Sequence, residues 1–150
     1  MFKKSKHKAK AVRIDTLIGQ HTHIQGNLSF IGGLRIDGSV QGNISAGDEG
    51  HEQAVLTLSD QGSIEGEVRV PNFIVDGVVK GNIYVTGHIE LAAKAKIEGN
   101  VYYHMLEMAT GSQVNGQLIH IDTNQDILNL DHDVVEHTQN FQLEQKANLD

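Results

Sequence analysis

The sequence predicts an all-β chain that coils into a parallel β-solenoid of six turns. One five-residue phrase, apolar–any–Gly–any–apolar, recurs six times, and its glycines lie 16, 24, 15, 18 and 17 residues apart. Apolar residues alternate strictly inside each phrase, which is typical of short strands, three to five residues long, buried on one face. Such strands repeated without intervening helices exclude a βαβ sheet and favour a solenoid. The phrases begin at Ile24, Val40, Ile64, Val79, Ile97 and Val114.

We expect the six phrases to stack, so that their first apolar residues form one column in the core. Successive turns of a parallel solenoid pair about 4.8 Å apart, which places equivalent residues above one another. The central glycines then form a second column at a corner of the coil. A glycine in every turn marks a place where no side chain fits or where φ must be positive. The predicted structural corner glycines are Gly26, Gly42, Gly66, Gly81, Gly99 and Gly116.

A second phrase, apolar–any–apolar, precedes each later repeat, and Thr16 and Ile18 form a partial copy ahead of the first. Corners of two lengths join the two phrases. The short corner is Asp-Gly, at 37–38 and 76–77, a pair suited to tight turns. The corner two residues longer occupies 59–62, 92–95 and 109–112. The outlying interval of 24 residues contains a polar insert, 47–54, which we interpret as a surface loop.

Charge divides the chain into three predicted regions. Residues 1–13 hold six of the 12 Lys and Arg residues and no acid, whereas residues 14–150 hold all 19 acids and carry a balance of −13. We predict a basic arm over 1–13, the β-helix domain over 14–121 and an acidic, disordered tail over 122–150. Within that tail, Leu130, Val134 and Phe141 are also compatible with a weak amphipathic helix.

Composition narrows the class of protein. Hydrophobic residues make up 39% of the chain, but Trp is absent and aromatic residues reach only 5%, so Ile, Val and Leu must build the core. The absence of Cys excludes disulfides, thiolate metal sites and a Cys nucleophile, and it fits a reducing compartment. No apolar run approaches the ~20 residues that cross a bilayer, and the first residues lack the 7–15-residue apolar stretch typical of a secretion signal. We therefore expect a cytoplasmic protein.

The sequence contains no pattern that predicts catalysis. The P-loop, G-x-S-x-G and H-E-x-x-H motifs are all absent. His88, His104 and His120 lie 16 residues apart, near the repeat period, but their positions relative to the apolar phrases differ. We therefore assign these three histidines to different columns and faces. The sequence predicts no catalytic residue, no metal site and no cofactor.

The two ends of the coil predict self-assembly. A parallel solenoid ends in unpaired backbone N–H and C=O groups, and natural solenoids usually cover them with a cap. Neither end of this repeat region carries a recognisable cap, so we predict end-to-end polymerisation. The candidate contact residues are Ile18, Ile24 and Leu28 in the first turn and Leu106, Met108, Val114 and Leu118 in the last turn.

The basic arm predicts a contact with anionic membrane lipids. Met1 and Phe2 form an apolar tip beside Lys3, Lys4 and Lys6. Each Lys near an anionic leaflet is worth ~1 kcal/mol, and burial of Phe2 roughly 1.5–3 kcal/mol, so one copy binds marginally. Many copies on one filament bind strongly, and polymerisation and membrane attachment therefore reinforce each other. A purely solubilising arm is the alternative, and the acidic body disfavours nucleic acid as a partner.

The chain resembles the bactofilins from residue 1 to about residue 121. The resemblance rests on residues 16–19, on residues 30–44 with the phrase Leu-Arg-Ile-Asp-Gly, and on residues 95–101 with the phrases that follow them. It implies a right-handed parallel β-helix, nucleotide-independent non-polar filaments on the cytoplasmic membrane face, and a scaffold for cell-wall, cell-shape or other localised bacterial machinery. It also maps the family's membrane motif onto Met1–Lys4 and Lys6. Val114 stands where the family often has an aromatic residue, and the insert is unusual.

The competing class is an enzyme with a left-handed β-helix, either a hexapeptide acyltransferase or a γ-type carbonic anhydrase. Those coils consist of regular hexads, whereas the spacing here varies and no three histidines share a site. We therefore predict a non-enzymatic cytoskeletal scaffold, peripheral on the inner face of the cytoplasmic membrane. Its predicted partners are further copies of itself, anionic lipids, and cell-wall or polarity proteins whose identity the sequence leaves open.

Overall fold

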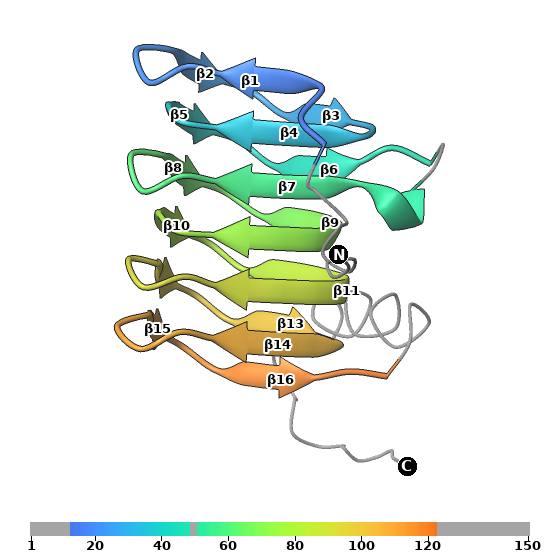
Figure 1. The fold of residues 1–150 in the computed structure, drawn as a ribbon, viewed down its shortest axis with the longest axis vertical. Helices are drawn as coiled ribbons and strands as arrows, with labels where there is room; N and C mark the ends of the chain where they lie inside the picture. The colour runs from blue at the N-terminus through green and yellow to red at the C-terminus, as the bar shows by residue number, and fades with distance from the viewer. Residues whose placement is uncertain (1–12, 49–50, 123–150) are drawn as a thin grey trace, which may run out of the picture.

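The computed structural model describes residues 13–48 and 51–122. They form a coil of parallel strands whose six turns stack along one axis, with the first turn at one end and the last turn at the other (Figure 1). Within these residues the only helical segment is the 3₁₀ helix η2 (His51–Gln53). The predicted parallel β-solenoid is confirmed. The predicted arm before residue 13 and the tail beyond residue 122 lie outside the described residues.

Each turn places strands at three positions. The first position holds β1 (Thr16–Ile18), β4 (Gly33–Ile36), β7 (Val55–Leu58), the ends of β9 (Val68–Val75) and β11 (Ile83–Leu91), and β14 (Met105–Met108). The second position holds β2 (His23–Gln25), β5 (Ser39–Gln41), β8 (Ser63–Glu65), β10 (Val78–Lys80), β12 (Lys96–Glu98) and β15 (Gln113–Asn115). The third position holds β3 (Leu28–Phe30), β6 (Ile44–Ala46), the beginnings of β9 and β11, β13 (Val101–Tyr103) and β16 (Leu118–His120).

The register of the strands confirms the predicted columns. The second-position strands pair so that Ile24 lies beside Val40, Val40 beside Ile64, and so on through Val114. The partial copy at 16–18 also pairs as expected, because Thr16 aligns with Leu34 and Ile18 with Ile36. Residues that are equivalent in the repeat are therefore neighbours in space.

Two strands are longer than the sequence predicted. Strands β9 and β11 have eight and nine residues and pass from the third position of one turn to the first position of the next. They join the first and third positions into one ten-stranded sheet, beside a separate six-stranded sheet at the second position. At the corner between the third and first positions, β9 and β11 stay paired with their neighbours while the chain bends. In β11 the bend coincides with a shift in register between Val85 and His88.

Aliphatic side chains fill the inside of the coil. In the middle turns the inward residues are almost completely buried. Most of them are Ile, Leu or Val, and the aromatic residue Phe73 is fully buried among them. Toward the ends the same columns become partly exposed, as at Ile24 and Val114. Burial in a solenoid depends on a neighbouring turn on each side. Within residues 13–48 and 51–122, the first and last turns each have a neighbouring turn on one side only.

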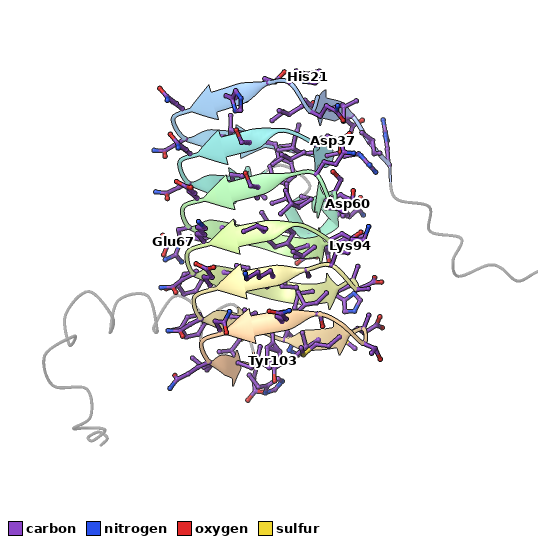
Figure 2. All side chains as sticks on the ribbon, turned by 90° about the vertical axis from the view of Figure 1, so that its left-hand side faces the viewer. His21, Asp37, Asp60, Glu67, Lys94 and Tyr103 are labelled. Carbon is purple, nitrogen blue, oxygen red and sulfur yellow. The ribbon has the colours of Figure 1, made fainter. Side chains whose placement is uncertain are left out.

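The short corners at 37–38 and 76–77 and the long corners at 59–62, 92–95 and 109–112 lie along one edge of the coil, where Figure 2 labels His21, Asp37, Asp60 and Lys94. The short Asp37-Gly38 corner lies against the turn before it, because the Asp37 amide donates to the Ile18 carbonyl over 2.8 Å. The long corners project further, and the Lys94 ammonium reaches the Asp60 carboxylate at 3.2 Å. That ion pair is largely solvated, so its stabilising contribution is small.

The polar insert joins β6 to β7 and is anchored at its C-terminal end. The Asn72 side-chain amide donates to the carbonyl oxygens of Glu52 at 3.1 Å and Ala54 at 3.0 Å. Ala54 itself is buried. The insert therefore rejoins the coil through contacts with the next turn.

Candidate functional site

The glycine column occupies a corner where the turns approach each other closely. A Cβ on Gly66 would lie 2.1 Å from the carbonyl oxygen of Gly42, and φ of Gly66 is +152°. The same clash recurs with the preceding glycine at Gly42, Gly81, Gly99 and Gly116. Gly26 differs, since among the described residues no turn precedes it and nothing lies within 4 Å of its Cβ position. Backbone atoms of the neighbouring turn therefore exclude a side chain from this corner.

An asparagine ladder follows the glycine column, and the sequence analysis missed it. The Asn27 Oδ1 accepts a hydrogen bond from the Asn43 amide at 2.9 Å, and the Asn43 Oδ1 accepts one from the Glu67 amide at 3.0 Å. Further along, Asn82 and Asn100 accept in the same way, each over 3.0 Å. Asn follows Gly in four of the six phrases, which was the available signal.

The first end of the coil is an open sheet edge. Strands β1, β2 and β3 pair with the second turn and, among the described residues, with no other strand. Of the predicted contact residues, Ile18 is buried, whereas Ile24 and Leu28 are partly exposed. Phe30 is also partly exposed here, although the sequence analysis did not select it.

The last end is open in the same way and also exposes apolar side chains. Strands β14, β15 and β16 pair only with the preceding turn within residues 13–48 and 51–122. Met108 is 45% exposed and Leu118 41% exposed, whereas Leu106 and Val114 are partly buried. Met105, which was not predicted, is 58% exposed.

The structure does not bring the predicted contact residues into a single site. Ile18, Ile24 and Leu28 lie in the first turn, whereas the other four lie in the last turn at the opposite end of the coil (Figure 1). The molecule therefore presents two separate apolar ends. Each is rimmed by strands that pair on one side only with other described strands, a geometry that admits further strands from another molecule.

A scan against family models identifies residues 16–119 as "Bactofilin: Polymer-forming cytoskeletal". The chain belongs to the bactofilin family. Two curated bactofilins of Myxococcus xanthus (strain DK1622), BacP and BacO, are each 27% identical to it over 104 residues, or 69% of this chain. The matched region spans 41% of BacP and 78% of BacO. No solved structure matches the chain.

The bactofilin assignment confirms the predicted resemblance and places the chain in a polymer-forming cytoskeletal family. The family match covers the strands of all six turns. The predicted membrane-binding residues, Met1, Phe2, Lys3, Lys4 and Lys6, lie outside both that match and the described residues. Among the residues described, no helix is long and apolar enough to cross a membrane.

Histidines gather at the last end of this bactofilin more closely than predicted. The rings of His104 and His120 stack with centroids 5.9 Å apart, so the prediction that these two residues lie on different faces is wrong. The reason is that His104 lies at the corner directly after β13, beside the position where β16 carries His120. His88 instead contacts Glu107 at 3.5 Å. No group of three potential metal ligands occurs in the described part of the chain.

Proposed function

We propose that this bactofilin is a cytoskeletal scaffold whose copies join end to end into filaments. The filaments form without bound nucleotide, lie on the cytoplasmic face of the membrane, and localise cell-shape or cell-wall machinery. One observation carries the proposal: both ends of the coil combine open strand edges with exposed apolar side chains, among them Leu17 near the first end and Met108 and Leu118 at the last end.

End-to-end contact would satisfy both features at once. Another turn placed about 4.8 Å beyond the last one continues the pairing of the strands and covers the inward columns. The middle turns show the result, because Ile64 and Val79 are completely buried between two neighbours, whereas Val114 in the same column is not. Burial of such aliphatic side chains supplies roughly 1.5–3 kcal/mol each.

The glycine column supports assembly without a nucleotide. In a phosphate-binding loop the glycine amides point freely toward the phosphates. Here the Gly42 amide donates to the Glu65 carbonyl at 2.9 Å, and the Gly66 amide donates to the Lys80 carbonyl at 2.9 Å. These amides therefore connect turns of the coil. The column acts as a structural corner in a protein that we propose is not an enzyme.

The test replaces the exposed apolar residues at the last end with charges. The double variant Met108→Lys/Leu118→Lys is compared with Gln41→Lys/Ser45→Lys, a control that adds the same charge at exposed positions in the second turn. Negative-stain microscopy and sedimentation without added nucleotide should show filaments for the wild type and the control, and short or monomeric particles for the end variant. Circular dichroism verifies the fold.

Filaments of unchanged length in the end variant would contradict end-to-end assembly through this surface. Loss of filaments in both variants would show that added charge alone prevents assembly, and it would equally count against a specific end contact.

A further inference from the structure

The outer side of the third strand position carries a stacked polar–aromatic column. Arg69, Tyr84, Tyr102 and Ile119 are aligned there by the pairing of β9, β11, β13 and β16. The two tyrosine rings are parallel with centroids 4.6 Å apart, and the Arg69 guanidinium lies 4.0 Å from the centre of the Tyr84 ring. We refer to these four residues as the outer column.

The tyrosines of the outer column are much more buried than their position explains. Tyr84 is 2% exposed and Tyr102 is 6% exposed, whereas Ser29 and Ser45, earlier in the same outward column, are exposed. Stacking covers the faces of the rings but not their outer edges. An additional segment must therefore lie over these edges.

The chain itself supplies the beginning of that segment. Ile121, directly after β16, is 7% exposed and packs with Tyr84 and Tyr102 in one buried cluster. Its amide donates to the Tyr103 carbonyl at 2.8 Å, which extends the pairing past the end of β16. The chain thus leaves the last turn on the outer side of the coil, beside Tyr102. The described residues end one position later, at Asp122.

We propose that residues 123–136 dock along the outer column and cover Tyr102 and Tyr84. This segment starts where Ile121 already lies in the cluster, and Tyr84 is two strand spacings, about 10 Å, from β16. At up to ~3.5 Å per residue, a few residues are enough to reach it.

The composition of the segment suits the surface. Ile127, Leu130 and Val134 recur at intervals of three and four, which places them on one side if the segment is helical. Asp131, Asp133 and Glu136 provide negative charge for the Arg69 end of the column.

Docking at this position would keep the tail clear of assembly. The outer column lies on the side of the coil, so both open ends remain free for the contacts proposed above. The docked segment would instead occupy a lateral surface and hide its aromatic residues from other partners. Docking of this segment does not require end-to-end assembly.

The experiment measures how fast each tyrosine is nitrated by tetranitromethane in the full chain, with the products located by mass spectrometry. The triple variant Ile127→Ser/Leu130→Ser/Val134→Ser should nitrate Tyr84 and Tyr102 about tenfold faster than the wild type, because its docked state loses apolar contacts. The matched control, Phe141→Ser/Leu143→Ser/Leu149→Ser, changes three apolar residues farther along the tail and should leave both rates unchanged.

Several outcomes would overturn the proposal. Rapid nitration of both tyrosines in the wild type would show that nothing covers them. Equal acceleration in the two triple variants would remove the assignment to 123–136. If dilution of the wild type exposes the tyrosines and the triple variant does not, a second copy is the cover. If deletion of residues 1–8 exposes them instead, the arm is the cover.

Discussion

At the scale of single residues, a missing Cβ sets how closely the turns of this bactofilin approach. A Cβ on Gly66 would lie only 2.1 Å from the carbonyl oxygen of Gly42, which is too close for two atoms that are not bonded. Neither of these atoms can move without separating paired strands on both sides of the corner. Glycine is therefore required here both by the close stacking of turns and by the positive φ. The requirement is stronger at a glycine that stacks on a preceding turn.

Gly66→Ala should destabilise the coil more than Gly26→Ala. Both residues have positive φ, at +152° and +137°, but only Gly66 meets backbone of a preceding turn. We expect a loss of roughly 3 kcal/mol for Gly66→Ala and roughly 1 kcal/mol for Gly26→Ala. Denaturant unfolding followed by circular dichroism, under conditions where the chain is monomeric, measures both. Equal losses would mean that φ alone determines the cost.

Ionisation of the Tyr84 hydroxyl should lower the stability of the coil at alkaline pH. Burial raises the pKa of its hydroxyl from 10.0 to about 12, with smaller contributions from Tyr102 and Glu67 and opposing ones from Arg69 and a hydrogen bond with Asn82. The folded state thus favours the neutral phenol. This contribution is complete below the pKa of the unfolded chain, near 10, and is lost as the pH rises through about 12.

Tyr84→Phe should remove that loss. Between pH 9 and pH 12 we expect the wild type to lose on the order of 1–3 kcal/mol more unfolding free energy than the variant, because Phe has no proton to release. Urea unfolding of both proteins across this range provides the comparison. Parallel pH profiles would show that the Tyr84 hydroxyl ionises equally easily in both states.

At the scale of elements, the asparagine ladder fixes the corner between the second and third strand positions. Each Asn Oδ1 accepts the amide of the equivalent residue one turn later, so the corner gains hydrogen bonds that the strands do not provide. Glu67 interrupts the ladder and pairs with Arg69 at 3.1 Å instead. The ladder therefore consists of two segments, one in each half of the coil.

Asn43→Ala should destabilise the first segment by about 1 kcal/mol. The substitution leaves the Glu67 amide without its side-chain acceptor and removes nothing from the core, since Asn43 is exposed. Gln41→Ala, on the outer side of a strand in the same turn, should change stability by less than about 0.5 kcal/mol and is the control. Similar values for the two substitutions, from denaturant unfolding, would argue against the ladder.

At the scale of the whole molecule, the open ends and the basic arm are predicted to act together. The arm supplies Phe2 and the positive charges of Lys3, Lys4 and Lys6 once per copy, so a filament presents them in series. Repeated weak contacts combine into strong attachment when they are linked. Membrane binding should therefore depend on assembly as well as on the arm.

Sedimentation with anionic liposomes tests this coupling. Lys3→Ala/Lys4→Ala/Lys6→Ala should weaken binding about 100-fold, since each lysine contributes ~1 kcal/mol. Met108→Ser/Leu118→Ser, which adds no charge and keeps the arm intact, should also weaken binding because its copies are not linked. Liposomes without anionic lipid are the control and should bind neither the wild type nor the variants. Undiminished binding by the lysine variant would remove the arm from the proposal.

The sequence by itself determined the coil and the neighbours within it. Its repeat of about 17 residues identifies equivalent positions, and a parallel solenoid places equivalent positions side by side, so Ile24, Val40 and Ile64 could be aligned without a structure. The same logic located both terminal turns. It works because each of these contacts repeats one local pattern.

Only the tertiary structure decided the contacts between positions that are not equivalent. The stacking of His104 on His120 depends on the path of the chain around one corner, and the cluster of Tyr84 and Tyr102 includes Ile121, which lies beyond the last strand. The extension of β9 and β11 through a corner likewise depends on how closely adjoining turns pack. Periodicity carries no information about such contacts, because they arise where the repeat bends, is interrupted or ends.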